Sequence, residues 1–189
     1  MVSPMIDSIK KDSKQRMEKA VDVVSQEFAK LRTGKATPAL LDGIKIDYYG
    51  QSTPLKQVAN VSAPEPRLLV VQPWDKSMLG EIEKAIIKSD LGLNPTNDGI
   101  VIRIPVPQLT EERRKDLVKI AKKIAEEGKV AIRNIRRDAN EKLKKSEKSS
   151  DISEDEMHTG QDKVQELTDE YIKKIDEMLE HKEIEIMTV

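Results

Sequence analysis

The chain has 189 residues and a formal net charge of −1, and 37% of its residues are hydrophobic and 35% charged. It contains no cysteine, which excludes disulfides and thiolate metal sites, and no apolar run approaches the roughly 20 residues that span a bilayer. The first residues lack both the apolar region of a secretory signal and the acid-poor composition of a transit peptide. We therefore expect a cytoplasmic protein that does not bind membranes.

A first long helix is predicted over residues 4–32. Its apolar positions recur at three- and four-residue steps, which is the spacing of one buried helix face. These positions are Ile6, Ile9, Met17, Ala20, Val24, Phe28 and Leu31, with Ser13 at the one weak position. Gly34 is expected to end the helix, because glycine readily adopts the left-handed conformation found after helix C-termini.

The pattern then changes to one typical of strands. Residues 43–50 alternate with period two between glycines, and residues 57–62 and 67–72 predict two further strands. Pro64 and Pro66 lack the amide hydrogens of a strand ladder, so a turn is expected around them.

A shorter helix follows these strands. Asp75 is expected to cap a helix that continues to about Lys88, and Trp74 is expected to fill the core of the same small domain. Residues 93–99 are rich in turn-forming residues, and residues 100–104 predict a final strand.

Two long helices complete the chain. The first is expected to begin after Thr110 and to reach Lys148, and the second to begin at a capping box formed by Ser153 and Glu156. The predicted buried face of the first consists of Leu117, Ile120, Ile124, Ala131, Ile135, Ala139 and Leu143. The second is predicted to bury Val164, Leu167, Tyr171, Ile175 and Met178. Gly128 costs about 1 kcal/mol in a helix relative to alanine, so a close approach of neighbouring helices is expected there.

These elements predict an α+β protein in which a small β/α/β domain is inserted into an elongated three-helix bundle. Residues 1–31 and 106–189 are assigned to the bundle, and residues 32–105 to the inserted domain. Only two chain segments connect the domains, so a hinge and domain motion are expected. The predicted hinge residues are Arg32, Thr33, Gly34, Pro105, Val106 and Pro107.

The small net charge hides an uneven distribution. Residues 107–148 carry 14 Lys and Arg against 8 Asp and Glu, a net charge of +6, and residues 149–189 carry 4 against 13, a net charge of −9. On the first of these helices a line of cations, interrupted by Glu126, is predicted to lie opposite the buried face, and we call it the basic stripe. It comprises Lys115, Lys119, Lys122, Lys129, Arg133, Arg136, Arg137 and Lys144, with Arg136 towards its edge.

The residues of the basic stripe are open to two interpretations. The stripe could be a solvated face that pairs in part with the acidic last helix, which is the usual role of surface charge. Alternatively, it binds the phosphate backbone of a nucleic acid, for which the planar guanidinium groups of Arg133, Arg136 and Arg137 are well suited. Because no aromatic residues are interleaved with the cations, structured RNA or a duplex is favoured over stacking of single-stranded bases.

Enzyme interpretations find little support in the sequence. Gly34-Lys35 resembles the end of a phosphate-binding loop but lacks the preceding glycine and strand. His158 and His181 stand alone in acidic surroundings, with no nucleophile nearby in the sequence. We therefore expect no catalytic residues, no metal site and no cofactor.

Several sequence motifs occur in order along the chain. They are residues 31–36 (LRTGKA), 40–44 (LLDGI), 89–95 (SDLGLNP), 102–105 (IRIP), 109–115 (LTEERRK), 130–140 (VAIRNIRRDAN), 161–162 (QD) and 167–169 (LTD). In their order and spacing these motifs resemble the ribosome recycling factor family over nearly the whole chain.

The resemblance implies an L-shaped translation factor that binds the ribosome after termination. In the family, the bundle lies across the A and P sites against large-subunit ribosomal RNA, and elongation factor G uses GTP to drive separation of the subunits. By position, the family's functional arginines correspond to Arg114, Arg133 and Arg136, of which the last two also lie on the basic stripe. Lys35 stands where many family members have arginine, so charge is kept but the guanidinium fork is lost.

We therefore predict a monomer that acts mechanically on the ribosome. Its hinge lets the small domain swing when elongation factor G pushes, and its bundle transmits that force to the RNA bridges between the subunits. Its RNA-binding residues are predicted to be Arg133, Arg136, Arg137, Arg114, Lys129, Lys122, Lys119 and Lys115. One alternative is an RNA-binding or RNA-chaperone protein that acts away from the ribosome. Another is a helical adaptor whose acidic last helix holds a basic partner.

Overall fold

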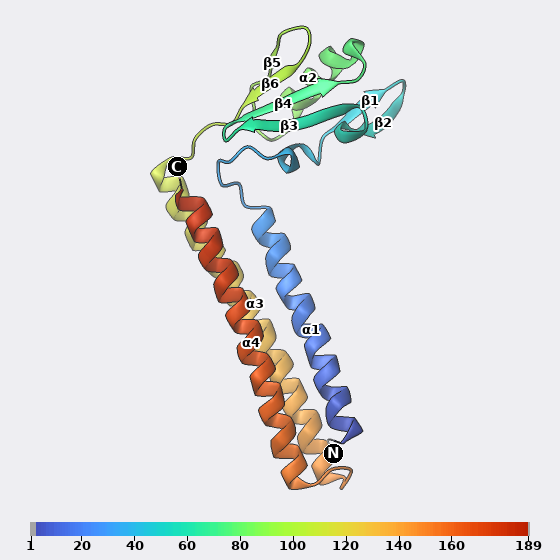
Figure 1. Ribbon diagram of the computed structural model, residues 1–189, viewed down its shortest axis with the longest axis vertical. Coiled ribbons are helices and arrows are strands. Elements are labelled where there is room, and N and C mark those ends of the chain that lie inside the picture. The colour runs from blue at the N-terminus through green and yellow to red at the C-terminus, as the bar shows by residue number, and fades with distance from the viewer. Residues whose placement is uncertain (1–2, 189) are drawn as a thin grey trace. The chain divides into compact units, whose positions relative to one another are not determined.

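The computed structural model describes residues 3–188, which divide into two compact units (Figure 1). One unit joins the residues up to Thr33 to Glu111–Thr188, and the other comprises Gly34–Thr110. The second connection between the units therefore lies between Thr110 and Glu111, several residues after the boundary predicted between residues 105 and 106. The reason is that Val106 is buried in the core of the smaller unit and donates its backbone N–H to the carbonyl oxygen of Arg67 at 2.9 Å.

The larger unit is a bundle of three helices that run side by side (Figure 1). They are α1 (Pro4–Ala29), α3 (Glu111–Lys148) and α4 (Glu154–Met187). The helix α1 ends at Ala29, slightly earlier than predicted, and buries Ile6, Ser13, Met17, Val24 and Phe28. None of the helices in residues 3–188 combines the length and the apolar character needed to cross a bilayer.

The predicted capping box begins α4. The side chain of Ser153 accepts a hydrogen bond from the backbone N–H of Glu156 at 3.2 Å, and the carboxylate of Glu156 accepts one from the N–H of Ser153 at 2.9 Å. These bonds satisfy two amides that an isolated helix start would leave unpaired. The start of the last helix is therefore confirmed.

The buried face of α3 differs in part from the prediction. The structure buries Leu117, Ala121, Ala125, Gly128, Ile132, Ile135, Ala139 and Leu143. By contrast, Ile120 is 39% exposed and Ile124 and Ala131 are half-buried, so the true face is rotated towards the small residues. A Cβ atom at Gly128 would overlap Val24 of α1 and lie 3.1 Å from Cδ1 of Ile175 of α4, which confirms the predicted close approach of helices.

Tyr171 is the largest fully buried side chain of the bundle, and its hydroxyl donates a hydrogen bond to the carboxylate of Glu18 at 3.1 Å. The ammonium of Lys174 lies 4.3 Å from the centre of its ring. Burial, together with the bond to Glu18, raises the pKa of Tyr171 to about 12. This polar contact ties α4 to α1 within an otherwise apolar core.

The smaller unit contains two antiparallel sheets and one helix. The strands β1 (Lys45–Tyr48) and β2 (Gln51–Pro54) form a hairpin. The second sheet has the order β3-β4-β6-β5, built from β3 (Ala59–Glu65), β4 (Leu68–Pro73), β5 (Thr96–Asn97) and β6 (Ile102–Pro105). The helix α2 (Leu79–Lys88) follows a short 3-10 helix (Lys76–Met78), and the Asp75 side chain caps that turn by accepting a bond from the N–H of Ser77 at 3.0 Å.

The core of the smaller unit is aliphatic. Its most deeply buried members are Leu41, Ile46, Leu55, Leu69, Val71, Ile82, Ile86, Ile102 and Ile104. The alternation of β4 directs Leu69, Val71 and Pro73 inwards, so the next residue, Trp74, points the other way and is 70% exposed. The prediction that Trp74 fills this core is therefore wrong.

Two strand predictions also need correction. The segment predicted as one strand over residues 43–50 ends at Tyr48, where the chain turns into β2. The turn expected around Pro64 and Pro66 is instead partly strand, because β3 continues to Glu65 through a register shift. Since β3 is an edge strand, a proline there removes no ladder hydrogen bond that the sheet requires.

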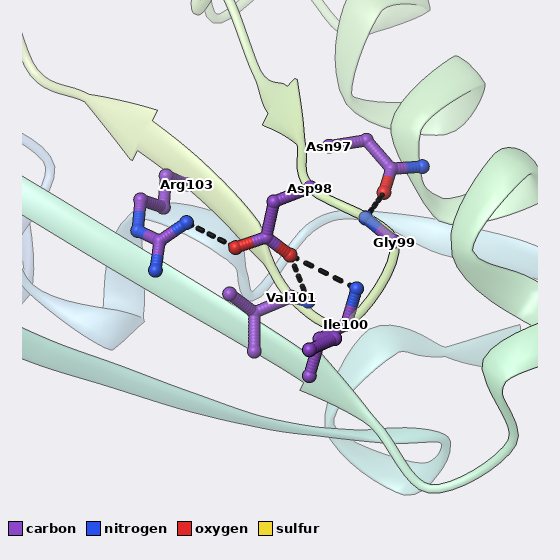
Figure 2. Close-up of polar contacts among 6 residues, drawn as sticks. All are labelled: Asn97, Asp98, Gly99, Ile100, Val101 and Arg103. Carbon is purple, nitrogen blue, oxygen red and sulfur yellow. Dashed lines mark hydrogen bonds and ion pairs between the residues drawn. The ribbon is translucent and has the colours of Figure 1, made fainter.

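The loop between β5 and β6 is organised by the Asp98 side chain (Figure 2). One carboxylate oxygen accepts hydrogen bonds from the N–H groups of Ile100 at 2.9 Å and Val101 at 2.8 Å, and the other pairs with the guanidinium of Arg103. The Asn97 side chain similarly accepts a bond from the N–H of Gly99 at 2.8 Å. The bonds from Val101, Ile100 and Arg103 lower the pKa of Asp98 from 3.8 to about 2.

An Asp98→Ala substitution is therefore expected to destabilise the smaller unit in a pH-dependent way. Because the pKa is about 2 in the folded chain and 3.8 for the free carboxyl, the stabilisation is present above pH 3.8 and is lost as the pH falls towards 2. Urea unfolding should show the variant to be less stable near neutral pH and equal to the unsubstituted chain at the acid end. Asp90→Ala, at an exposed position, is the control, and a constant difference across the pH range would contradict this role.

Candidate nucleic-acid interface

The helix α3 carries the whole basic stripe, but its members differ in exposure. Lys115, Lys119, Lys122, Arg137 and Lys144 are exposed, whereas Lys129, Arg133 and Arg136 are half-buried. The prediction placed the stripe opposite the buried face. Because the true buried face is rotated towards Ala121 and Ala125, one edge of the stripe lies along the boundary with α4 instead.

That edge is paired with α4. The ammonium of Lys129 forms an ion pair with Asp176, the ammonium of Lys122 lies 3.7 Å from the carboxylate of Glu183, and Arg136 donates a hydrogen bond to the side-chain oxygen of Gln165 at 3.3 Å. The pairing of the basic helix with the acidic one therefore accounts for part of the charge. The side chain of Lys129 is only 18% exposed, against 63% for that of Lys122.

Two further members of the stripe pair within α3. Arg133 contacts the carboxylate of Glu126 at 3.0 Å, and Lys115 contacts that of Glu111 at 3.0 Å. Glu126, the one interruption of the stripe, thus serves as a local counter-ion. Exposed pairs of this kind contribute about 0–1 kcal/mol, so a phosphate oxygen can replace the carboxylate at little cost.

The remaining cations of the stripe are unpaired within residues 3–188. Lys119, Arg137 and Lys144 are exposed and form neither an ion pair nor a side-chain hydrogen bond in this part of the chain. Together with Arg133 they follow one side of α3 over several turns. The arrangement suits contact with successive phosphates, which need no specific base sequence.

Arg114 differs from the stripe residues. It lies in the first turns of α3, is half-buried, and its Nε atom is buried without a hydrogen-bond partner in the described residues. Charge periodicity placed Arg114 at the edge of the stripe and supported it only weakly, so the family resemblance was the main reason to choose it. Its unsatisfied donor is an independent structural feature at that position.

The predicted hinge residues fall on both sides of the division between the units. The hydroxyl of Thr33 donates to the carboxylate of Glu185 within the larger unit, at 3.2 Å. Gly34 has a φ of +75°, which favours glycine, and a Cβ there would lie 3.1 Å from Cγ of Leu109. Arg32 and Pro107 are exposed, whereas Pro105 belongs to β6 and Val106 to the core of the smaller unit.

Comparison with known proteins gives matches over most of the chain. The family model for ribosome recycling factor matches residues 24–187. The ribosome-recycling factor of Natranaerobius thermophilus is 61% identical over 181 residues, which are 96% of this chain and 98% of the relative. That of Carboxydothermus hydrogenoformans is 59% identical over 185 residues, which are 98% of this chain and 100% of the relative.

Solved structures agree with the sequence matches. A solution structure of the ribosome recycling factor is 44% identical, with a TM-score of 0.77 and full coverage of both chains. Models of the Thermus thermophilus ribosome recycling factor, with Escherichia coli elongation factor G on the post-termination complex, give 50% identity, a TM-score of 0.64 and full coverage. The helical bundle with a separate β-containing domain is thus confirmed, and this chain belongs to the ribosome recycling factor family.

Proposed function

We propose that this protein binds the post-termination ribosome and, together with elongation factor G and GTP, separates the two subunits for another round of translation. The observation that carries the proposal is the line of unpaired or weakly paired cations on α3, in a chain that matches ribosome-recycling factors along almost its whole length. One of the similar structures is a model of a ribosome recycling factor bound, with elongation factor G, to the post-termination complex.

The bundle docks through its basic stripe across the A and P sites, against large-subunit ribosomal RNA. The contacts are made by Lys115, Lys119, Lys122, Lys129, Arg133, Arg136, Arg137 and Arg114. Lys122 and Lys129 already pair with carboxylates of α4 and exchange them for phosphate only in part, whereas Arg136 contacts only the neutral side chain of Gln165. Lys119, Arg133, Arg136 and Arg137 therefore carry most of the affinity. Arg114 supplies a guanidinium group whose Nε has no hydrogen-bond partner among residues 3–188.

The work of separation is mechanical. Elongation factor G pushes, and the two connecting segments bend, one near Thr33-Gly34 and the other between Pro107 and Glu111, after the buried Val106. The long helices transmit the force to the RNA contacts between the subunits. We also infer that this chain is a cytoplasmic monomer with no catalytic activity of its own, since GTP hydrolysis belongs to elongation factor G.

Sedimentation of post-termination ribosomes tests the proposal. In the presence of this protein, elongation factor G and GTP, the peak of intact ribosomes should disappear, and omission of any one component should preserve it. If the protein co-sediments with ribosomes but the peak persists, subunit separation is refuted and RNA binding away from recycling becomes the better account. If it neither co-sediments nor binds RNA in a salt-dependent way, the adaptor alternative is favoured.

A longer connection between the units should uncouple binding from separation. Insertion of a Gly-Ser-Gly segment between Thr33 and Gly34 is expected to leave ribosome binding unchanged and to slow separation, because a flexible linker transmits less force than a short one. Stopped-flow light scattering would measure the rate. The same insertion in the turn between α3 and α4 is the control, and separation at the normal rate in both variants would show that the connection transmits no force.

A further inference from the structure

The central part of the basic stripe, residues 122–133, carries no net free charge. Each of its cations faces a carboxylate, and these pairs are Lys122 with Glu183 at 3.7 Å, Lys129 with Asp176, and Arg133 with Glu126 at 3.0 Å. Beside the stripe, Lys123 and Glu127 are both exposed and of opposite sign, so they add no net charge. We call this neutral part of the stripe the gap.

Free positive charge lies on both sides of the gap. Within residues 3–188, no ion pair is formed by the stripe cations Lys119, Arg136, Arg137 and Lys144. The first of these lies before the gap and the other three lie after it. The surface that attracts phosphate is therefore divided into two parts.

Glu126 stands at the centre of the gap. Seven residues separate it from Lys119 on one side and from Arg133 on the other, which is about 10.5 Å along the helix axis in each direction. Because seven residues are close to two helical turns, the three side chains lie on the same side of α3. The side chain of Glu126 is 59% exposed, so its carboxylate meets any RNA that lies along the stripe.

The ion pair between Glu126 and Arg133 links phosphate binding to the charge of the gap. The pair is exposed on both sides and therefore weak, so a phosphate can take the guanidinium. Glu126 then keeps no counter-ion, because no other ion pair within residues 3–188 involves it. A second phosphate placed directly over Glu126 is repelled by this uncompensated carboxylate, all the more because the gap has become negative.

This pattern of charge distinguishes between two classes of RNA. Each strand of a regular duplex carries a phosphate every few ångströms, so a duplex that follows the stripe from Lys119 to Arg137 places phosphates over Glu126. A folded RNA whose backbone turns away between two contact points binds both sides of the gap and leaves Glu126 in water. Rejection of the wrong partner is as effective a source of specificity as attraction of the right one.

We infer that Glu126 is a specificity-determining residue, which excludes a continuous phosphate backbone from the stripe and admits folded RNA that offers phosphates only on either side of the gap. The inference rests on the proposed function of the stripe as the ribosome-binding surface, and it specifies the class of RNA that this surface accepts. The one acidic interruption of the stripe thereby reduces capture of the protein by other cellular RNA.

A Glu126→Gln substitution tests the inference, because it removes the charge and keeps the shape of the side chain. We would measure anisotropy with a labelled RNA duplex of about 20 base pairs, which is longer than the stripe, and co-sedimentation with vacant ribosomes at the same salt concentration. The variant should bind the duplex about fivefold more tightly, and its affinity for ribosomes should change by less than about twofold. An equal gain for both, or no gain for the duplex, would overturn the inference.

Two further variants separate charge in the gap from other effects. Glu127→Gln removes the same charge from the next, exposed residue, which lies beside the stripe, and should leave the ratio of the two affinities unchanged. Glu126→Asp keeps the charge but shortens the reach towards Arg133, so it should retain the selectivity of the unsubstituted chain.

The sign of the effect distinguishes this role from a positioning role. If Glu126 served to hold the guanidinium of Arg133 ready for phosphate, Glu126→Gln would weaken binding to both kinds of RNA, and the inference would be overturned. Failure of the unsubstituted chain to bind ribosomes would instead refute the proposed function. The comparison of Glu126→Gln with Glu127→Gln on the duplex would still decide whether the gap excludes a continuous backbone.

Discussion

Replacement of both Arg133 and Arg136 by alanine is expected to weaken ribosome binding by on the order of 100-fold, because each charged hydrogen bond to phosphate contributes about 1.5–3 kcal/mol. The fold should persist, since Arg133 contacts Glu126 and Arg136 contacts Gln165 only at the surface. In a plot of log affinity against log salt, the slope should become shallower by about 2, one for each lost phosphate contact. Co-sedimentation at a series of salt concentrations measures both quantities.

Two control variants separate charge from geometry. Lys11→Ala with Lys14→Ala removes the same net charge from exposed positions on α1 and should change affinity little. Arg133→Lys with Arg136→Lys keeps the charge but removes the planar fork, so it should give an intermediate loss if the arginines bind phosphate through two hydrogen bonds. Unchanged affinity of the double alanine variant at every salt concentration would exclude the basic stripe as the ribosome-binding surface.

A Gly128→Ala substitution is expected to lower the free energy of unfolding of the bundle by about 1–3 kcal/mol, although alanine is the better helix former. The added methyl group would overlap Cγ2 of Val24 and press on Cδ1 of Ile175, and both neighbours are fully enclosed in the core. Denaturant unfolding followed by helical circular dichroism measures the change. Gly80→Ala, in a helix where a Cβ meets nothing within 4 Å, should be neutral or stabilising.

A double-mutant cycle shows whether the loss arises from this contact. Val24→Ala alone leaves a cavity and should destabilise the bundle, but in combination with Gly128→Ala the new methyl group occupies part of that space. The pair should therefore be more stable than the sum of the single effects by about 1 kcal/mol or more. Additive effects would mean that the helices can separate at this point and that their close approach is not required.

The long helices were predictable because their patterns are local and repeated. On α1, the spacing from Ile6 to Phe28 identified the buried residues, and the Ser153–Glu156 pair identified the start of α4. In the smaller unit β1, β3, β4 and β6 were predicted with inexact ends, and β2 and β5 were missed. The ends were inexact because Pro64 is tolerated on an edge strand and the hairpin turn carries Tyr49 where asparagine is typical. The cations of the stripe could be found from the sequence, but their partners could not.

By itself, the sequence determined the element types, the order of bundle and insert, the concentration of positive charge on α3 and the family, because each depends on periodicity, composition or matching motifs. Only the tertiary structure decided which neighbours each side chain has. It placed Ala121, Ala125 and Gly128 at the helix contacts in place of Ile120, since closeness of backbones there outweighs side-chain hydrophobicity. It also paired Lys129 with Asp176 and left Trp74 in solvent, because both outcomes depend on segments far apart in the sequence.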